Sequence, residues 1–353
     1  MLELFNKKSK PVLGVDISSS SIKLLELSKH GDKYQVECYA TRPLPEGAVV
    51  EKNIVRLDAV GEEMEKLSSL AKAQSRRAAV AVSGSAVITK IIELNASLSD
   101  ADMENQITVE ADQYIPYPLD EVAIDFERQR PSRKSEGMVE VLLAACKKEN
   151  VDSRVEALEM GGLQAVHVDI EAYAMERAFK LLCEQMGLES AGIVAIMDIG
   201  ATMTTIYILK DGVSIHTREQ VFGGARLAQA VQSHYGLSAV EAERAIIDNE
   251  LPESYTTEVL APFRAELVEQ LSRSLQFFFS SSQYNDVDRI VLAGGAAATA
   301  GLSEKMQEAL ATSVVVANPF AKMVLGSKVN KGLLHNDAAA LLLACGLAMR
   351  GFK

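Results

Sequence analysis

A series of strand, aspartate and small-residue turn occurs twice in this chain, and the repetition constrains the fold more than any other feature. The apolar run 12–15 ends at Asp16, and four serines then turn the chain into a second apolar run. The apolar run 193–197 ends at Asp198, and Gly200, Ala201 and Thr202 turn the chain into another. A third strand and a helix follow in both series. Two such series predict a duplicated α/β fold with two lobes.

Both turns have the composition of a phosphate-binding loop. Small side chains let an anion approach several backbone N–H groups, and hydroxyls add further donors. An aspartate repels phosphate, so its place at the strand end is explained by Mg²⁺, held mostly through water between carboxylate and phosphates. Two facing hairpins would hold ATP or ADP from both sides. The alternative is a pair of ordinary hairpins with exposed aspartates. The predicted phosphate and metal residues are Asp16, Ser18, Ser19, Ser20, Ser21, Lys23, Asp198, Gly200, Ala201 and Thr202.

Three further segments are candidates for the remainder of a nucleotide. Gly223 and Gly224 open a helix after the third strand of the second series. A buried strand at 289–292 runs into Gly294, Gly295 and Ala296, where a flat ring could lie on the backbone. Glu243 and Arg244 are adjacent on a predicted helix and could contact ribose and adenine. A solvated charged helix face explains Glu243 and Arg244 equally well.

The predicted organisation places a distinct block inside the first lobe. The first-lobe core is expected at 11–85 and 161–190, and a β-α-β-β-α block at 86–160 is expected to be inserted between these parts. The second lobe is expected at 191–236 and 287–334, around a helical excursion at 237–286. A final helix, within 335–353, is expected to return to the first lobe.

Bulk properties exclude several classes of protein. With 353 residues, a net charge of −12 and a pI near 5.1, the chain lacks the basic surface that nucleic acids require. It contains no P-loop motif and no histidine pair with metal-ligand spacing. Its four cysteines are scattered, which is typical of a reducing compartment. No apolar run is long enough for a signal peptide or membrane span, so we expect a cytoplasmic protein without a transmembrane segment.

The motifs resemble those of the actin/Hsp70 superfamily. Residues 14–18 (Gly-Val-Asp-Ile-Ser), 198–202 (Asp-Ile-Gly-Ala-Thr) and 292–295 (Leu-Ala-Gly-Gly) are similar to its two phosphate motifs and its adenosine motif. Segments 169–174 and 337–349 resemble its connecting helices. Residues 13–27, 110–116 and 318–320 narrow the resemblance to the PilM family, FtsA-like proteins of type IV pilus assembly. The resemblance implies an actin-like, ribonuclease H-like duplicated fold, with a 1C-type inserted subdomain.

The same resemblance implies the partners. PilM proteins bind ATP or ADP and the cytoplasmic N-terminal tail of PilN, in a groove between subdomains 1A and 1C. Pilus motor ATPases and the platform protein are further partners that it suggests. The chain would then be peripheral at the inner membrane through its partner. The groove residues expected here are Ile88, Ile91, Ile92, Val109, Gln113 and Tyr114.

Departures from the superfamily pattern bear on catalysis. Met203 follows Gly200-Ala201-Thr202, where chaperones and FtsA have a run of glycines and a threonine. Glu171 corresponds to the chaperone residue that orients metal or water, and no second base is evident. We therefore expect slow or negligible hydrolysis. A second class of function is a sugar-type kinase with Asp169 as the general base for a substrate hydroxyl. A filament-forming protein, like actin, is a third class compatible with the sequence.

Overall fold

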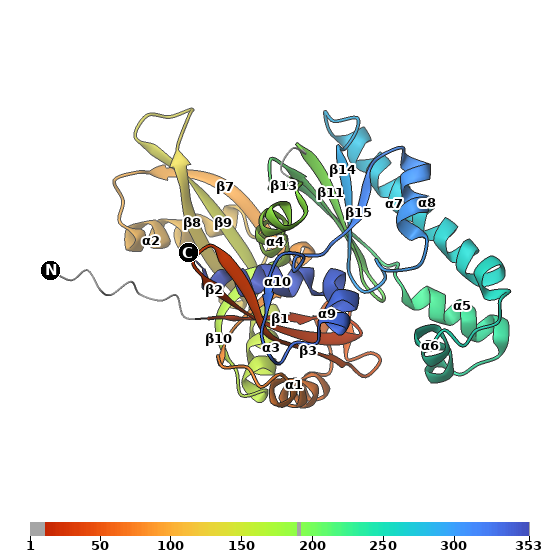
Figure 1. Ribbon diagram of the computed structural model, residues 1–353. Helices are drawn as coiled ribbons and strands as arrows, with labels where there is room; N and C mark the ends of the chain where they lie inside the picture. Colours follow the sequence, from red (N-terminus) through yellow and green to blue (C-terminus); the bar gives the residue numbers. More distant parts are fainter. Residues whose placement is uncertain (1–10, 189–191, 353) are drawn as a thin grey trace.

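Two lobes, each built around its own β-sheet, form the body of the molecule (Figure 1). The computed structural model describes residues 11–188 and 192–352. The first-lobe sheet has six strands in the order β10-β6-β1-β2-β3-β16, and the second has five in the order β13-β12-β11-β14-β15. In both sheets, three sequential antiparallel strands continue on one side into a parallel strand, so the two lobes share one plan.

The strands that carry the two aspartates lie where the apolar runs predicted them. The first sheet consists of β1 (Leu13–Ile17), β2 (Ser21–His30), β3 (Lys33–Pro43), β6 (Arg77–Val82), β10 (Gln164–Ile170) and β16 (Val324–Leu325). The second consists of β11 (Ile193–Ile199), β12 (Thr204–Lys210), β13 (Val213–Gln220), β14 (Arg289–Ala293) and β15 (Val314–Val316). The central strands of both sheets are apolar and almost wholly buried, as strands covered on both faces must be.

Helices lie on both faces of each sheet. Helices α4 (Glu171–Met186) and α10 (Leu342–Ala348) contribute to one apolar cluster with residues from both sheets. Helices α1 (Leu57–Ala71) and α3 (Lys148–Met160) contribute to the cluster on the far face of the first sheet. The far face of the second sheet is covered by α5 (Ala225–Tyr235), α6 (Ala239–Ile247), α7 (Ala261–Ser281) and α8 (Leu302–Leu310). The shared middle layer therefore joins the lobes through buried apolar surface.

A small subdomain projects from the first lobe between β6 and α3 (Figure 1). Its antiparallel sheet has the order β7-β9-β8, with β7 (Val87–Asn95), β8 (Val122–Pro131) and β9 (Met138–Lys147). Helix α2 (Asp100–Glu110) packs Met103 and Ile107 against one face of this sheet. Alternate residues of β9 are buried there, whereas those between them are only half-buried. The subdomain thus has one closed and one open face.

Two helices differ in extent from what the apolar periodicity of the sequence predicts. The helix predicted at 100–114 ends at Glu110 and continues as the 3₁₀ turn Ala111–Gln113. The helix predicted from residue 54 begins only at Leu57, because a short hairpin precedes it. That hairpin, β4 (Val49–Val50) and β5 (Asn53–Ile54), has two-residue strands that leave almost no periodic signal in the sequence.

The C-terminal helical run returns to the first lobe. It comprises α9 (Lys331–Asp337), a 3₁₀ turn, α10 and a last 3₁₀ turn. Within the described part of the chain, Lys331–Gly351 is the one helical run with the length and mean hydropathy (1.4) of a membrane span. Of its most apolar window 61% is buried in the fold, so packing in the core accounts for this composition.

Candidate functional site

The hairpin formed by β1 and β2, which carries Asp16 near its tip, is closed by its own serines and by a buried ion pair. Ser18 donates its backbone N–H to the Ser21 carbonyl at 2.9 Å, and its hydroxyl donates to the same oxygen. Asp16 and Lys23 stand directly opposite each other on β1 and β2. The Lys23 ammonium donates to the Asp16 carboxylate at 2.8 Å and to the Ser18 hydroxyl at 3.3 Å. Because both charged side chains are largely buried, the pair fixes the hairpin rigidly.

The second hairpin, formed by β11 and β12 around Asp198, is enclosed by the segments Gly223-Gly224 and Gly294-Gly295. Gly200 donates to the Met203 carbonyl and closes the turn. Gly224 donates in turn to the Gly200 carbonyl at 2.9 Å, and Ala296 donates to the Ile199 carbonyl at 3.0 Å. Segments that are far apart in the sequence therefore meet in one backbone cradle around Gly200. The structure brings together Asp198, Gly200, Ala201, Gly223, Gly224, Gly294 and Ala296.

Gly294 shows how closely this cradle is packed. It adopts φ +86°, a conformation that side-chain-bearing residues rarely adopt. A Cβ atom there would lie 2.4 Å from the Ile199 carbonyl oxygen and 2.6 Å from the Asp198 carboxylate. Gly294 is therefore required for β14 to pass beside the second aspartate.

The two aspartates are close enough to influence each other electrostatically. Burial raises the pKa of Asp198 to about 6, and the nearby charge of Asp16 adds to this rise, while Lys52 opposes it. A buried carboxylate with a raised pKa is typical of a functional site. Burial is the main cause of the rise here, and a cation bound beside Asp198 would offset it.

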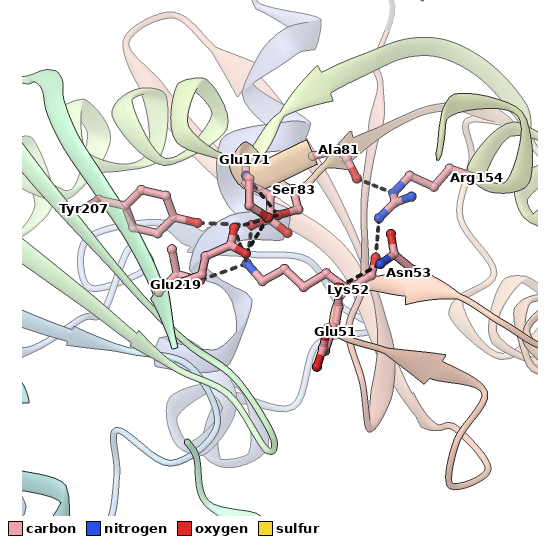
Figure 2. Close-up of polar contacts among 11 residues, drawn as sticks. Glu51, Lys52, Asn53, Ala81, Ser83, Arg154, Glu171, Tyr207 and Glu219 are labelled. Atoms are coloured by element: carbon pink, nitrogen blue, oxygen red, sulfur yellow. Dashed lines mark hydrogen bonds and ion pairs between the residues drawn. The ribbon is translucent and has the colours of Figure 1, made fainter. Parts of the chain in front are cut away.

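Lys52 extends from the tip of the β4–β5 hairpin to the second lobe (Figure 2). Its ammonium donates to the Glu171 carboxylate and, at 2.8 Å, to the Thr205 hydroxyl. It lies 3.7 Å from the Glu219 carboxylate. Burial alone would lower the pKa of this ammonium, but Glu171 and Glu219 outweigh burial and hold its pKa above the ordinary value. Lys52 was not among the predicted site residues, because a lysine in a short turn belongs to no recognisable motif.

Glu171 lies at the first position of α4, between the lobes. Its carboxylate accepts from the Tyr207 hydroxyl at 3.2 Å as well as from Lys52, and only 7% of the residue is exposed. It therefore sits in the same charged cluster as Asp198, to which it contributes a negative charge. This position fits a group that orients water or metal beside the phosphates.

Asp169, the base in the kinase alternative, is engaged in structural contacts instead. Its carboxylate accepts from Arg177, from Arg350 at 2.9 Å and from the Ile170 backbone N–H at 2.8 Å. Only 3% of the residue is exposed. Both oxygens of this carboxylate are therefore engaged by donors of the protein itself, which leaves it poorly placed to meet a substrate hydroxyl. The kinase hypothesis is therefore not favoured.

Glu243 and Arg244 lie on the exposed surface of α6. Arg244 pairs with Asp248 one turn along the same helix at 3.2 Å. This pairing is the solvated-face arrangement that the sequence left open. Their contact with ribose or adenine stays a prediction.

The six predicted groove residues lie on more than one surface of the inserted subdomain. Ile92 is buried under α2, and Ile88, four residues earlier on β7, lies on the same face of the sheet. Ile91 is 52% exposed on the open face, where it stands opposite Leu142 of β9. Val109 is 81% exposed on α2, on the other side of the sheet. Gln113 and Tyr114 follow α2, and the Tyr114 ring lies beneath the Lys90 ammonium.

The duplicated sheets, the middle helix layer and the paired Asp-tipped hairpins define an actin-like ATPase fold. A solved structure of ethanolamine utilization protein EutJ from Carboxydothermus hydrogenoformans shares this fold, with a TM-score of 0.57 at 15% identity over 96% of this chain and 89% of that one. The family described as type IV pilus assembly protein PilM matches residues 14–352. The chain belongs to this family.

A complex within this family is also similar in structure. The solved "PilM-PilN type IV pilus biogenesis complex" contains a chain that is 27% identical to this one. The TM-score is 0.77, and the alignment covers 98% of this chain and 99% of that chain. The inserted subdomain and the C-terminal return are thus part of the shared architecture.

Proposed function

We propose that this pilus assembly protein binds ATP or ADP between the Asp16 and Asp198 hairpins and acts as a scaffold, not as a rapid ATPase. The observation that carries this proposal is the matched geometry of the two hairpins. Each has a buried strand, an aspartate at its end and a turn whose backbone is closed by short hydrogen bonds. Such turns direct N–H groups at one point, as anion sites require.

Mg²⁺ fits this site as a companion of the nucleotide. Within residues 11–188 and 192–352, no group of three or more His, Cys, Asp or Glu side chains is arranged to hold a metal ion directly. Mg²⁺ commonly uses one or two carboxylates, with water and phosphate oxygens completing its shell. Asp16 and Asp198 would supply the carboxylates, mostly through water.

The macromolecular partner that we propose is the cytoplasmic N-terminal tail of a PilN-like inner-membrane protein. The family's solved complex carries PilN in its name. The open face of the inserted sheet offers an apolar surface formed by Ile91, Leu142 and Ala144. Glu127 of this face raises the pKa of Tyr173 on α4 as a minor contribution after burial, so the open face lies near the first lobe.

The geometry of the first lobe supports an extended peptide in this place. Strand β10 is the edge of the six-stranded sheet, so it has unpaired backbone groups on its outer side. A tail bound beside β10 could add a strand there and place its side chains against Ile91 and Leu142. Binding to this tail would hold the protein at the inner-membrane face. Motor ATPases and the platform protein are further proposed partners.

Isothermal titration with the tail dodecapeptide of a PilN-like protein tests the partner proposal. Ile91→Asp should weaken saturable binding at least tenfold, because it places a charge on the apolar open face. Val109→Asp is the matched control, since Val109 is exposed on the opposite side of the subdomain. Equal loss in both variants, or none in either, contradicts the proposed groove.

Nucleotide binding is tested separately by titration with ATP and ADP in the presence of Mg²⁺. We expect saturable binding and very slow ADP release from ATP, with no stimulation by sugars. Turnover at ordinary enzyme rates without a partner would overturn the scaffold assignment. Absence of any nucleotide binding would overturn the assignment of the nucleotide site to the two hairpins.

A further inference from the structure

The aspartates of the two lobes differ in where their lysine comes from. Asp16 has Lys23 directly opposite it on the next strand. The equivalent position opposite Asp198 is the neutral Thr205, and Glu219 stands opposite Thr205 on the strand beyond. Because opposed residues of antiparallel strands share a face, Asp198, Thr205 and Glu219 form one polar row across the second sheet.

Lys52 supplies the missing positive charge from the other lobe (Figure 2). Its ammonium donates to the Thr205 hydroxyl in the middle of the polar row and acts electrostatically on Asp198. The second phosphate hairpin begins immediately beyond this row, at Gly200. Lys52 therefore places a buried ammonium at the base of that hairpin.

The hairpin that carries Lys52 is held by tertiary contacts and not by its local sequence. Glu51 and Lys52 are the two central residues of the turn and have φ values of 46° and 64°. Both angles lie in the left-handed region, where such turns normally contain Asn or Gly. Arg154 of α3, which is 3% exposed, donates to the Lys52 carbonyl at 2.6 Å and to the Ala81 carbonyl at 2.7 Å. These contacts hold the backbone of Lys52 in place.

Both connections of the inserted subdomain attach to this charged cluster. On the entry side, Ser83 and Ser85 donate to the Glu219 carboxylate at 2.6 and 2.7 Å, just before β7 begins. On the exit side, β9 leads directly into α3, which carries Arg154. Lys52 and Glu219 thus stand between the second phosphate hairpin and both ends of the subdomain.

We propose that Lys52 is a ligand of the γ-phosphate when ATP is bound, and that its exchange between this phosphate and the carboxylates of Glu171 and Glu219 changes how the inserted subdomain is held. The proposal rests on the nucleotide site proposed above. A phosphate oxygen at the second hairpin competes with both carboxylates for the ammonium, because charge-assisted hydrogen bonds are the strongest available there. Once Lys52 has left it, the Glu219 carboxylate keeps its hydrogen bonds from Ser83 and Ser85.

The affinities of Lys52→Met for Mg-ATP and Mg-ADP test the phosphate contact. We expect ATP to bind about ten- to a hundredfold more weakly, the range of a lost charged hydrogen bond, and ADP to change much less. Lys66→Met, which removes an exposed ammonium on α1, is the matched control and should change neither. Lys52→Arg keeps the charge and should retain the preference for ATP, which guards against a folding defect in the methionine variant.

A double variant separates a lost ligand from simple repulsion. If Lys52→Met weakened ATP binding only by leaving Glu219 unpaired, adding Glu219→Gln would restore the affinity. We expect no restoration. Restoration, or equal loss of ATP and ADP, overturns the phosphate assignment. If the wild-type protein binds no nucleotide at all, the proposed function itself fails, which is a distinguishable result.

Hydrogen exchange tests the connection to the inserted subdomain. In the wild-type protein, Mg-ATP should change amide exchange in β7 and β9 relative to Mg-ADP. Lys52→Met should abolish this difference. Ser85→Ala removes one hydrogen bond to Glu219 without touching the phosphates, and it should reduce the difference while leaving ATP affinity within about twofold. An ATP-dependent change that persists unaltered in both variants overturns the coupling.

Discussion

Replacing Asp198 by asparagine should stabilise the protein in the absence of nucleotide while abolishing tight Mg-nucleotide binding. The pKa of Asp198 is raised from 3.8 to about 6, first by burial and then by the nearby carboxylates. The folded state therefore holds the proton more tightly than the unfolded chain does. Below about pH 4 the ionisation of Asp198 does not lower the free energy of unfolding. The loss grows between about pH 4 and about pH 6 and is complete above pH 6.

The size of the effect follows from the shift. A difference of about two pKa units corresponds to about 3 kcal/mol of free energy of unfolding. Asp198 is not fully buried, so water shares part of its charge, and we expect a gain of about 1–2 kcal/mol at pH 7.5. For a chain of this length the melting temperature should rise by a few degrees, on the order of 2–5 °C. At pH 5 the gain should be about half as large, because wild-type Asp198 is then mostly protonated.

The assay is thermal and urea unfolding of the full chain at pH 5 and 7.5, with and without Mg-ATP. Asp16→Asn is the matched control, since it leaves the buried Lys23 ammonium without its carboxylate. It should destabilise by roughly 3 kcal/mol, the cost of breaking a buried ion pair. Both variants should lose the rise in melting temperature that Mg-ATP gives the wild-type protein. An unchanged or lowered stability for Asp198→Asn at pH 7.5 would refute the reasoning.

Three further outcomes are expected. Gly294→Ala should lower the free energy of unfolding by more than about 2 kcal/mol and prevent nucleotide binding, because its Cβ would overlap the Ile199 carbonyl. Gly212 has φ +79° but open space around it, so Gly212→Ala is the control and should cost only about 1 kcal/mol in urea unfolding. Asp169→Asn should lower stability, because it uncouples two arginines, yet leave ATP affinity in titrations unchanged. Burial raises the pKa of Cys345 to about 12, so iodoacetamide at pH 8 should modify it only after unfolding, and rapid native-state labelling would contradict this.

The paired hairpins could be predicted from sequence because each signal is local. An apolar strand, an aspartate and a turn of small residues lie within ten residues of one another in both copies. Antiparallel neighbours pair through that same turn, so the register of Asp16 with Lys23 follows directly. The family resemblance then gave the architecture over nearly the whole chain.

The contacts that determine the roles of Asp169 and Lys52 could not be predicted from the sequence, because they join distant segments. Asp169 meets Arg350 only after the C-terminal run has returned to the first lobe. Lys52 meets Glu219 of the second lobe, from a hairpin too short to show a period. Strand alternation in β7 did contain the information that Ile91 and Ile92 face opposite ways. The predicted groove grouped them without using that alternation.

The position of α10 sets an order in which the lobes can form. Strand β1 lies early in the chain, yet a Cβ on its Gly14 would lie 1.9 Å from the Ala344 carbonyl oxygen, so the two backbones are in direct contact. The second-lobe sheet, by contrast, draws its strands from a continuous stretch between β11 and β15. During synthesis the strands of the second-lobe sheet can therefore pair before α10 is made, although the middle-layer face of this sheet, like that of the first, stays exposed until then. The first-lobe segments wait longest for α10 because they are synthesised first. They should therefore need protection from aggregation for the longest time.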